Sequence, residues 1–263
     1  MAIPKIIHQT FVRKHDLPQQ VLDAQACLRA LNPDWEYRLY DDQDMLDFIE
    51  DKYDSNVLRA YNKINPLYGA ARADLFRYLL IHKVGGAYFD IKSMTSRPLD
   101  DIINGHDYVL SHWVVPPVGK WGMDFVQHPD GEYQQWHVIA APEHPFLKAA
   151  IERVLANIED YSIEKYGVAK LGVLEMTGPR AYTRAIAPIE AKYPHQHYKH
   201  EEQAGLVYSL LGWTGHLKLF PVSHPHYSQI VAPIVFHDET EMQMYKKHVV
   251  ARLYEISKNT RYG

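Results

Sequence analysis

The sequence predicts an α/β fold in which a Rossmann-type mixed sheet is flanked by helices. Two observations carry this prediction. Stretches with the apolar spacing of helices, such as residues 146–158, alternate with short apolar stretches typical of buried strands, such as residues 87–89. Polar residues also follow two of the expected strands directly, and open α/β sheets bind their ligands at the carboxyl ends of strands.

Composition fits one soluble globular domain. The chain has 263 residues, of which 46% are hydrophobic and 23% charged, and its formal net charge of −4 gives no reason to expect a nucleic-acid partner. The single cysteine, Cys27, excludes an internal disulfide, and its helical surroundings predict a packed thiol. The sequence shows neither a secretory-signal pattern nor a membrane-spanning stretch, so we expect a cytoplasmic protein.

The first strand, residues 5–7, is followed by His8, Gln9 and Thr10. In a doubly wound sheet this end of a strand faces the ligand, so the three polar side chains are candidates for ligand contacts. For His8 a second interpretation, a hydrogen-bonded structural histidine, fits equally well.

Scaffold elements follow. Residues 18–31 have helical spacing, residues 35–40 alternate as a strand does, and residues 57–64 again have helical spacing. Asp41 and Asp42 precede a helix, which favours capping over a metal site.

The stretch from residue 67 to residue 93 predicts a helix, a tight turn, a short strand and then a carboxylate. Glycine closes the helix at Gly85 and Gly86, because it adopts left-handed backbone angles without a steric cost. The strand delivers Asp90 to its carboxyl end. One apolar stripe is expected to face the sheet: Leu67, Ala71, Leu75 and Leu79.

Asp74 and Arg77 are three residues apart and therefore share a face of this helix. One interpretation is an ion pair on a solvated surface. The other places both side chains with Asp90 around one crevice, and the neighbouring glycine pair and strand favour it.

Four motifs in order resemble the DXD-containing glycosyltransferases of family 32, which include yeast α-mannosyltransferases and bacterial capsule and lipooligosaccharide transferases. The motifs are IPKIIHQTF, NPDWEYRLYDD, ARADLFRYLLIHKVGGAYFD and TGP. The resemblance implies a single GT-A-like domain spanning residues 1–263, in which residues 1–110 bind the nucleotide sugar and residues 111–263 form the acceptor side.

The resemblance also implies the reaction: retaining transfer of a sugar to a glycan or lipid-linked acceptor in surface polysaccharide synthesis. A UDP-sugar is the favoured donor and GDP-mannose the next. The expected donor-binding residues are His8, Gln9, Thr10, Asp74, Arg77, Gly86, Tyr88 and Asp90, and the expected catalytic residues are Asp90, Lys92 and Arg77.

The chain departs from the family at the acidic motif. Asp90-Ile91-Lys92 stands where the family has Asp-x-Asp, which usually holds Mn²⁺ or Mg²⁺, and a protonated lysine cannot bind a metal. Three alternatives remain. Lys92 neutralises the diphosphate without a metal, Asp90 with His237 or Asp238 holds a cation, or the protein binds sugar nucleotides or glycans without turnover.

The region from residue 111 to residue 135 lacks periodicity and predicts a long loop. Trp113, Trp121 and Trp136 either stack on sugar rings or pack in the protein. A strand is expected at residues 136–140. Thr177 is a candidate N-cap and Pro179 opens a helix, although an acceptor or phosphate role fits the motif as well.

Three histidines, His195, His197 and His200, lie in a polar stretch without a predicted strand or helix, which favours a solvated connection over a metal site. Beyond them, residues 216–220, 225–229 and 232–238 predict short strands. A final helix carries a basic rim, which fits a charged outer face or peripheral contact with an anionic membrane. The rim consists of Lys246, Lys247, Arg252 and Lys258. The oligomeric state is not predicted.

Overall fold

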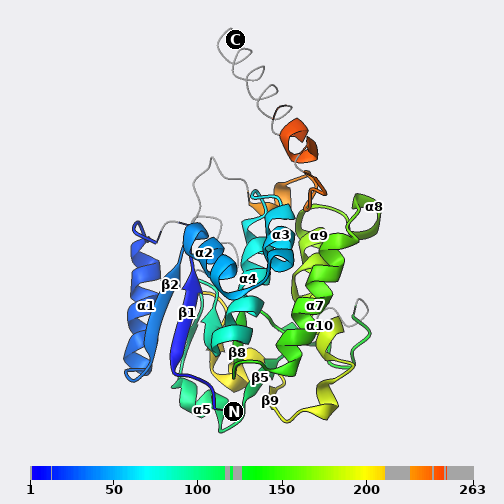
Figure 1. The fold of residues 1–263 in the computed structure, drawn as a ribbon. Helices are drawn as coiled ribbons and strands as arrows, with labels where there is room; N and C mark the ends of the chain where they lie inside the picture. The colour runs from blue at the N-terminus through cyan, green and yellow to red at the C-terminus, as the bar shows by residue number, and fades with distance from the viewer. Residues whose placement is uncertain are drawn as a thin grey trace, which may run out of the picture.

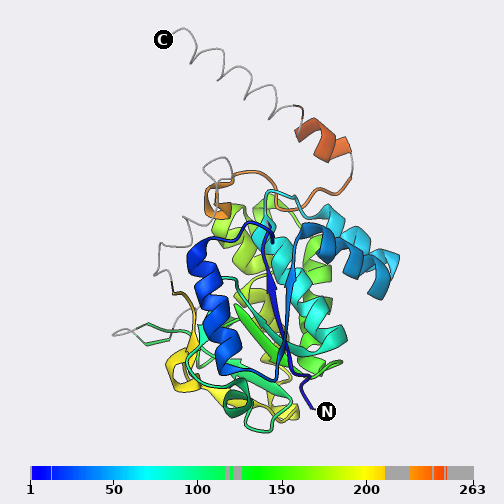
Figure 2. The same cartoon turned by 90° about the vertical axis from the view of Figure 1, so that its left-hand side faces the viewer.

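The computed structural model describes residues 2–12, 14–115, 119–120, 126–210, 226–238, 240–245 and 247. It contains a six-stranded mixed sheet in the order β2-β1-β3-β8-β5-β9, with helices on both faces (Figures 1 and 2). The strands are β1 (Ile6–Thr10), β2 (Glu36–Tyr40), β3 (Gly86–Phe89), β5 (Tyr108–Ser111), β8 (His137–Ala140) and β9 (Gln196–Tyr198). β8 is antiparallel to both of its neighbours, and the other pairs are parallel. The predicted α/β class is confirmed.

The remaining elements are helices and two small antiparallel sheets. The helices are α1 (Gln19–Leu31), α2 (Asp42–Lys52), α3 (Ser55–Lys63), α4 (Gly69–Val84), α5 (Leu99–Ile103), α7 (Pro145–Glu159), α8 (Ile163–Tyr166), α9 (Ala169–Met176), α10 (Pro179–Ile186), α11 (Glu201–Ala204), and the 3-10 turns η1 (Glu190–Lys192) and η3 (Tyr227–Gln229). β4 (Met94–Thr95) pairs with β10 (Leu206–Val207), and β6 (Val114–Val115) with β7 (Gly119–Lys120).

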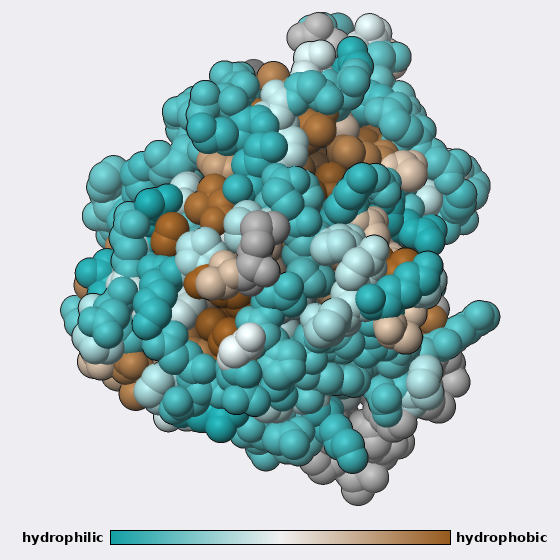
Figure 3. Space-filling model, turned by 60° about the horizontal axis from the view of Figure 1, so that its bottom comes forward, coloured by the Kyte–Doolittle hydropathy of each residue, from teal (hydrophilic) through white to brown (hydrophobic). Residues whose placement is uncertain are grey.

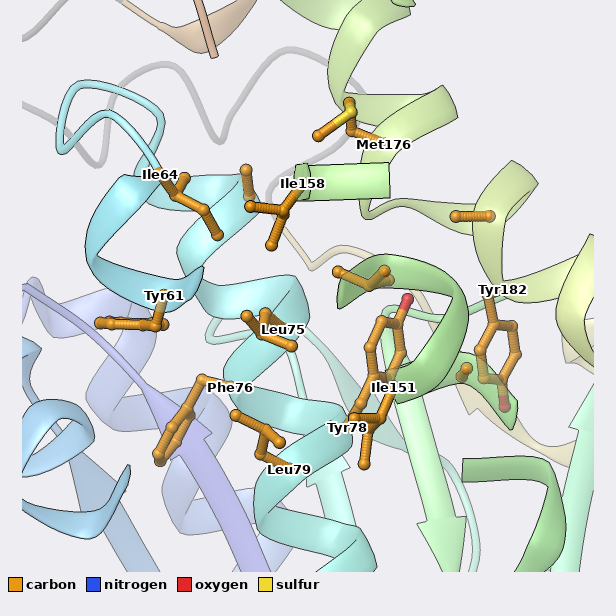
Figure 4. Close-up of a cluster of buried hydrophobic side chains, with 14 of the residues drawn as sticks. Tyr61, Ile64, Leu75, Phe76, Tyr78, Leu79, Ile151, Ile158, Met176 and Tyr182 are labelled. Atoms are coloured by element: carbon orange, nitrogen blue, oxygen red, sulfur yellow. The ribbon is translucent and has the colours of Figure 1, made fainter. Parts of the chain in front are cut away.

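The sheet separates two hydrophobic clusters, because successive side chains of a strand point to opposite faces. In β3, Tyr88 packs in the cluster beneath α4 and α7, whereas Ala87 and Phe89 pack in the cluster beneath α1 and α5. Figure 4 shows part of the first cluster, where the rings of Tyr78 and Tyr182 stack with centroids 5.4 Å apart.

Helix α4 confirms most of the prediction for the central stretch. Gly85, at φ +72°, ends the helix, and a Cβ there would lie 2.7 Å from side-chain atoms of Pro4 and Pro142. Ala71, Leu75 and Leu79 are fully buried. Leu67 is 45% exposed, so its place in the apolar stripe is wrong; the helix begins two residues after it.

Several local predictions need correction. Cys27 is exposed rather than packed, since it lies on the outer side of α1. His8, Gln9 and Thr10 belong to β1 itself, which is longer than predicted. Residues 225–229 contain the turn η3 instead of a strand.

The second half of the chain also differs. His197 lies in β9, which pairs with β5, whereas the sequence predicted a solvated connection. Residues 232–238 contribute one isolated bridge, between Val235 and Ile64. Trp136 is buried against Phe89, which supports packing over sugar stacking.

The surface view of Figure 3 shows a largely hydrophilic face with separate hydrophobic patches. None of the helices in the described ranges is long and apolar enough to cross a membrane. Most of the predicted basic helix, together with Trp121 and residues 216–220, lies outside the described residues.

Candidate functional site

The strand order reverses at β1, because β2 lies on one side of it and β3 on the other. In open α/β sheets, the carboxyl ends of strands at such a point form the ligand site. The Nε2 of Gln9 donates to the backbone oxygen of Asp90 at 3.1 Å, and the hydroxyls of Thr10 and Tyr88 are 2.8 Å apart. The polar residues at the ends of β1 and β3 are therefore joined.

Helix α4 brings two charges to the same place. The Nη2 of Arg77 lies 3.2 Å from Oδ1 of Asp74 and 3.0 Å from Oδ1 of Asp90. The side chains of Asp74 and Arg77 are each 5% exposed, but that of Asp90 is 27% exposed. The three groups converge, and Asp90 is the one that reaches solvent.

Arg77 is saturated with protein partners. Its Nη1 donates to the backbone oxygen and to Oε1 of Gln135, at 2.6 and 2.7 Å, and its Nε donates to the carbonyl of Ala73 at 3.3 Å. Burial acts to lower the pKa of Arg77, but Tyr88, Asp90 and Asp74 outweigh it and raise that pKa. The guanidinium therefore stays charged and fixed behind Asp90.

Asp74 is equally enclosed. Its Oδ2 accepts a hydrogen bond from the hydroxyl of Thr177 at 2.8 Å, and its Oδ1 accepts one from Nε2 of Gln135 at 3.1 Å. Burial raises the pKa of Asp74, while Arg77 and these two hydrogen bonds oppose the rise. Thr177 is thus not the N-cap of α10, a position that Gly178 occupies; Pro179 in the first turn is confirmed.

Both ring nitrogens of His8 have hydrogen-bond partners within the protein. Its Nδ1 lies 3.0 Å from the Tyr40 hydroxyl and its Nε2 lies 3.1 Å from the Gly85 carbonyl. Burial lowers the pKa of His8 to about 3. A Cβ on Gly86 would approach Nε2 of His8 to 3.0 Å, so this glycine makes room for the ring. These contacts favour the structural interpretation of His8.

Lys92 lies beside the acid. Its Nζ donates to the Tyr208 hydroxyl at 2.8 Å and lies 4.1 Å from the centre of that ring. Burial lowers the pKa of Lys92, and the Asp90 carboxylate opposes this effect. Burial raises the pKa of the Tyr227 phenol, and the negative charges of Asp74 and Asp90 add to this rise.

Sequence reasoning did not identify Gln135, Tyr208 or Tyr227. All three lie outside regular helices and strands or in a single short turn, so no periodicity marks them. From the second half of the chain, the sequence signalled the Thr177-Gly178-Pro179 motif and His237 with Asp238.

The residues around Asp90 do not fit a cation held by two protein carboxylates, because the second position of the motif carries an ammonium group. His237 places Nε2 2.8 Å from the carbonyl of Tyr161. Across the described ranges, no contact joins His237 to Asp90.

The chain is similar to several known glycosyltransferases. The model for the "glycosyltransferase sugar-binding region containing DXD motif" matches residues 18–109. Inositol phosphoceramide mannosyltransferase 3 of Schizosaccharomyces pombe is 38% identical over 103 residues, which are 39% of this chain and 28% of that protein. The initiation-specific α-1,6-mannosyltransferase of Candida albicans is 26% identical over 208 residues, 70% of this chain and 52% of that protein.

A solved structure described as PaToxG glycosyltransferase shares the fold. It aligns with a TM-score of 0.50 over 71% of this chain and 69% of its own, at 16% sequence identity. The matched segments cover at most about half of the length of the two mannosyltransferases. The resemblance inferred from the motifs is confirmed: residues 18–109 match the family model, and the mannosyltransferases are similar to this chain over that region and beyond it.

Proposed function

We propose that this protein is a retaining glycosyltransferase that moves a sugar from a nucleotide-sugar donor to a glycan or lipid-linked acceptor. The observation that carries the proposal is the position of Asp90. It is partly exposed at the strand-order reversal and is held there by the buried Asp74–Arg77 pair. Retention of anomeric configuration is implied by the family resemblance.

The reaction breaks the bond between the anomeric carbon and a phosphate oxygen, so negative charge grows on the departing diphosphate. A fixed cation aimed at that charge is typically the largest catalytic contribution. The ammonium group of Lys92 is two residues after Asp90, and the charge of Asp90 opposes the lowering of its pKa by burial. We propose that Lys92 neutralises the diphosphate, while Asp90 accepts hydrogen bonds from hydroxyl groups of the donor.

We further propose that residues 1–110 bind the donor and that residues 111–263 provide the acceptor side. Gln135 and Thr177, from the second half, contact Arg77 and Asp74 of the first half. Each half would therefore affect the other's geometry. Because Asp74 and Arg77 are enclosed, we assign them to holding Asp90 and leave direct donor contact to more exposed groups.

The printed names of the relatives are those of mannosyltransferases, which favours GDP-mannose as the first donor to test, followed by UDP-sugars. The purified chain is incubated with each donor and a panel of glycan and lipid-linked acceptors, and release of the nucleotide diphosphate is followed with Mn²⁺, with Mg²⁺ and with EDTA. Turnover with one donor is the expected result. Binding of a donor without turnover under every condition would instead support the catalytically silent alternative, which Lys92 motivates.

The charge-reversal variant Lys92→Asp tests the role of the ammonium. If Lys92 stands in for a metal, turnover of this variant falls in EDTA and is restored in part by Mn²⁺, because the change recreates Asp-x-Asp. Lys148→Asp, at an exposed position of α7, is the matched control and should leave turnover unchanged. Equal turnover of Lys92→Asp and wild type in EDTA would contradict the assignment.

A further inference from the structure

A second group of ligand-type side chains lies at the other edge of the sheet, where β5 pairs with β9. His112 follows β5, and His197 is in β9; their ring centroids are 4.9 Å apart. His128 stacks on His112 at 5.2 Å, and Tyr133 packs on His112 at 4.6 Å. Three separate segments of the chain thus bring imidazoles together.

Glu190, in η1, lies between these imidazoles. Its Oε1 is 3.2 Å from Nε2 of His195 and 3.6 Å from Nδ1 of His197, and its Oε2 is 3.5 Å from Nε2 of His128. Around a tetrahedral zinc ion, with donors about 2.0–2.1 Å away, neighbouring donor atoms are roughly 3.3 Å apart. The spacing around Glu190 is that of such a coordination shell.

The donor atoms fall into two triads. Glu190, His195 and His197 form one, and His112, His128 and Asp130 form the other; within each triad all donor atoms lie within 4.8 Å of one another. Neither triad includes a residue of the Asp90 site.

His112 shows that hydrogen bonds within the protein do not account for the cluster. It is 1% exposed, and neither of its ring nitrogens has a hydrogen-bond partner in the described part of the chain. A buried polar group without a partner gives up its hydration and gains no hydrogen bond in return, so such groups are rare in native proteins. A bound cation beside His112 would supply the missing interaction.

His195 is also arranged as a metal-binding histidine. Its Nδ1 donates to the carbonyl of Tyr193 at 2.9 Å, and its Nε2 faces Oε1 of Glu190 at 3.2 Å. Histidines that bind metals commonly donate their second nitrogen to a carbonyl in this way.

We propose that this cluster binds one divalent transition-metal ion of the zinc class, with Glu190, His195 and His197 as its protein ligands and the triad of His112, His128 and Asp130 beside it. Imidazole nitrogens with one carboxylate suit zinc better than magnesium or calcium, which favour oxygen. The ion would tie β9 and η1 to the end of β5. It would also steady residues 126–135, which lead from His128 to Gln135 and so to Arg77.

The test is a titration of the EDTA-treated full-length protein with Co²⁺, followed by its visible absorption and by displacement with Zn²⁺. We expect one tetrahedral Co²⁺ per chain, displaced by Zn²⁺. His197→Gln and Glu190→Gln should each weaken binding at least about tenfold. His106→Gln is the control, since His106 is partly exposed and donates to the carbonyl of Asn104; it should bind as wild type does.

The variant Asp90→Asn separates this site from the donor site and should keep full Co²⁺ binding. Zn²⁺ should raise the melting temperature of wild type and of Asp90→Asn, but not of His197→Gln. Absence of Co²⁺ binding by wild type, unchanged affinity in both ligand variants, or loss of binding in Asp90→Asn would each overturn the proposal. Metal binding and melting temperature do not depend on glycosyl transfer. A failure of the proposed function would therefore leave these readouts unchanged.

Discussion

The Asp90 site and the histidine cluster at β5 and β9 satisfy their buried polar groups in opposite ways. At the Asp90 site, the guanidinium of Arg77 and both carboxylate oxygens of Asp74 are bonded to protein groups. In the histidine cluster, His112 is equally buried and has no hydrogen-bond partner among the described residues.

This difference distinguishes side chains that hold another residue in position from side chains that bind a ligand. A saturated buried network has no capacity left for a ligand, so Asp74 and Arg77 serve by holding Asp90, whose carboxylate is partly exposed. An unsaturated buried group keeps its capacity and marks where a ligand completes the structure. The two regions should accordingly respond to substitution in different ways.

The largest effect on stability is expected from Arg77→Ala. Removing the guanidinium leaves the Asp74 carboxylate buried beside no cation, and breaking a buried pair in this way costs about 3–5 kcal/mol. Urea denaturation measures the loss in the free energy of unfolding. Arg59→Ala, at an exposed position on α3, is the control and should change it by less than about 0.5 kcal/mol. A loss below 1 kcal/mol for Arg77→Ala would mean that the network is not cooperative.

The next effect concerns activity alone. Asp90→Asn removes the partly exposed charge while leaving the buried pair in place, so we expect turnover to fall at least about a hundredfold with little change in unfolding. Asp101→Asn, at an exposed position of α5, is the matched control. Near-normal transfer by Asp90→Asn would remove this residue from the catalytic site.

Thr177→Val should cost less. It deletes the hydroxyl that donates to Asp74 but keeps the shape of the side chain, so a loss of about 1–3 kcal/mol in the free energy of unfolding is expected. Thr177→Ser keeps the hydroxyl and should recover most of that loss. If Thr177→Val were as stable as Thr177→Ser, the hydrogen bond of the hydroxyl to Asp74 would not account for the contribution of this side chain.

Local sequence signals predicted the scaffold and half of the Asp90 site. The spacing of Asp74 and Arg77, the glycine pair and the strand before Asp90 each depend on near neighbours in the chain, and the structure places these three side chains together. The contacts of Gln135 and Thr177 with this pair span about sixty to a hundred residues, and no local pattern encodes them.

The histidine cluster was missed for the same reason. His195 and His197 lie in a polar stretch, and their significance depends on His112, which arrives through the pairing of β5 with β9. A sequence pattern shows the ligand types but not the strand register that brings them together. The polar composition of this stretch favours a solvated connection. The prediction was wrong because β9 pairs with β5 in the folded protein.

Near pH 6, the smallest effect comes from His8, whose contribution to stability depends on pH. This histidine is saturated like Arg77, and its burial disfavours the charged ring. Its pKa is about 3 in the folded protein and about 6.5 when unfolded, so between these values the unfolded chain binds more protons. Stability from His8 is complete above pH 6.5 and falls by about 1.4 kcal/mol per pH unit as acid is added.

The measurement is the free energy of unfolding of wild type and His8→Gln at pH 7, 6 and 5. Glutamine offers one acceptor and one donor but does not titrate, so the difference between the two proteins should shrink by about 1.4 kcal/mol per unit below pH 6. His106→Gln, whose histidine is partly exposed and lies outside the site, should follow the wild-type curve. Parallel curves for wild type and His8→Gln would show that the ring becomes protonated without lowering the free energy of unfolding. The contrast between saturated and unsaturated buried groups would then not extend to β1.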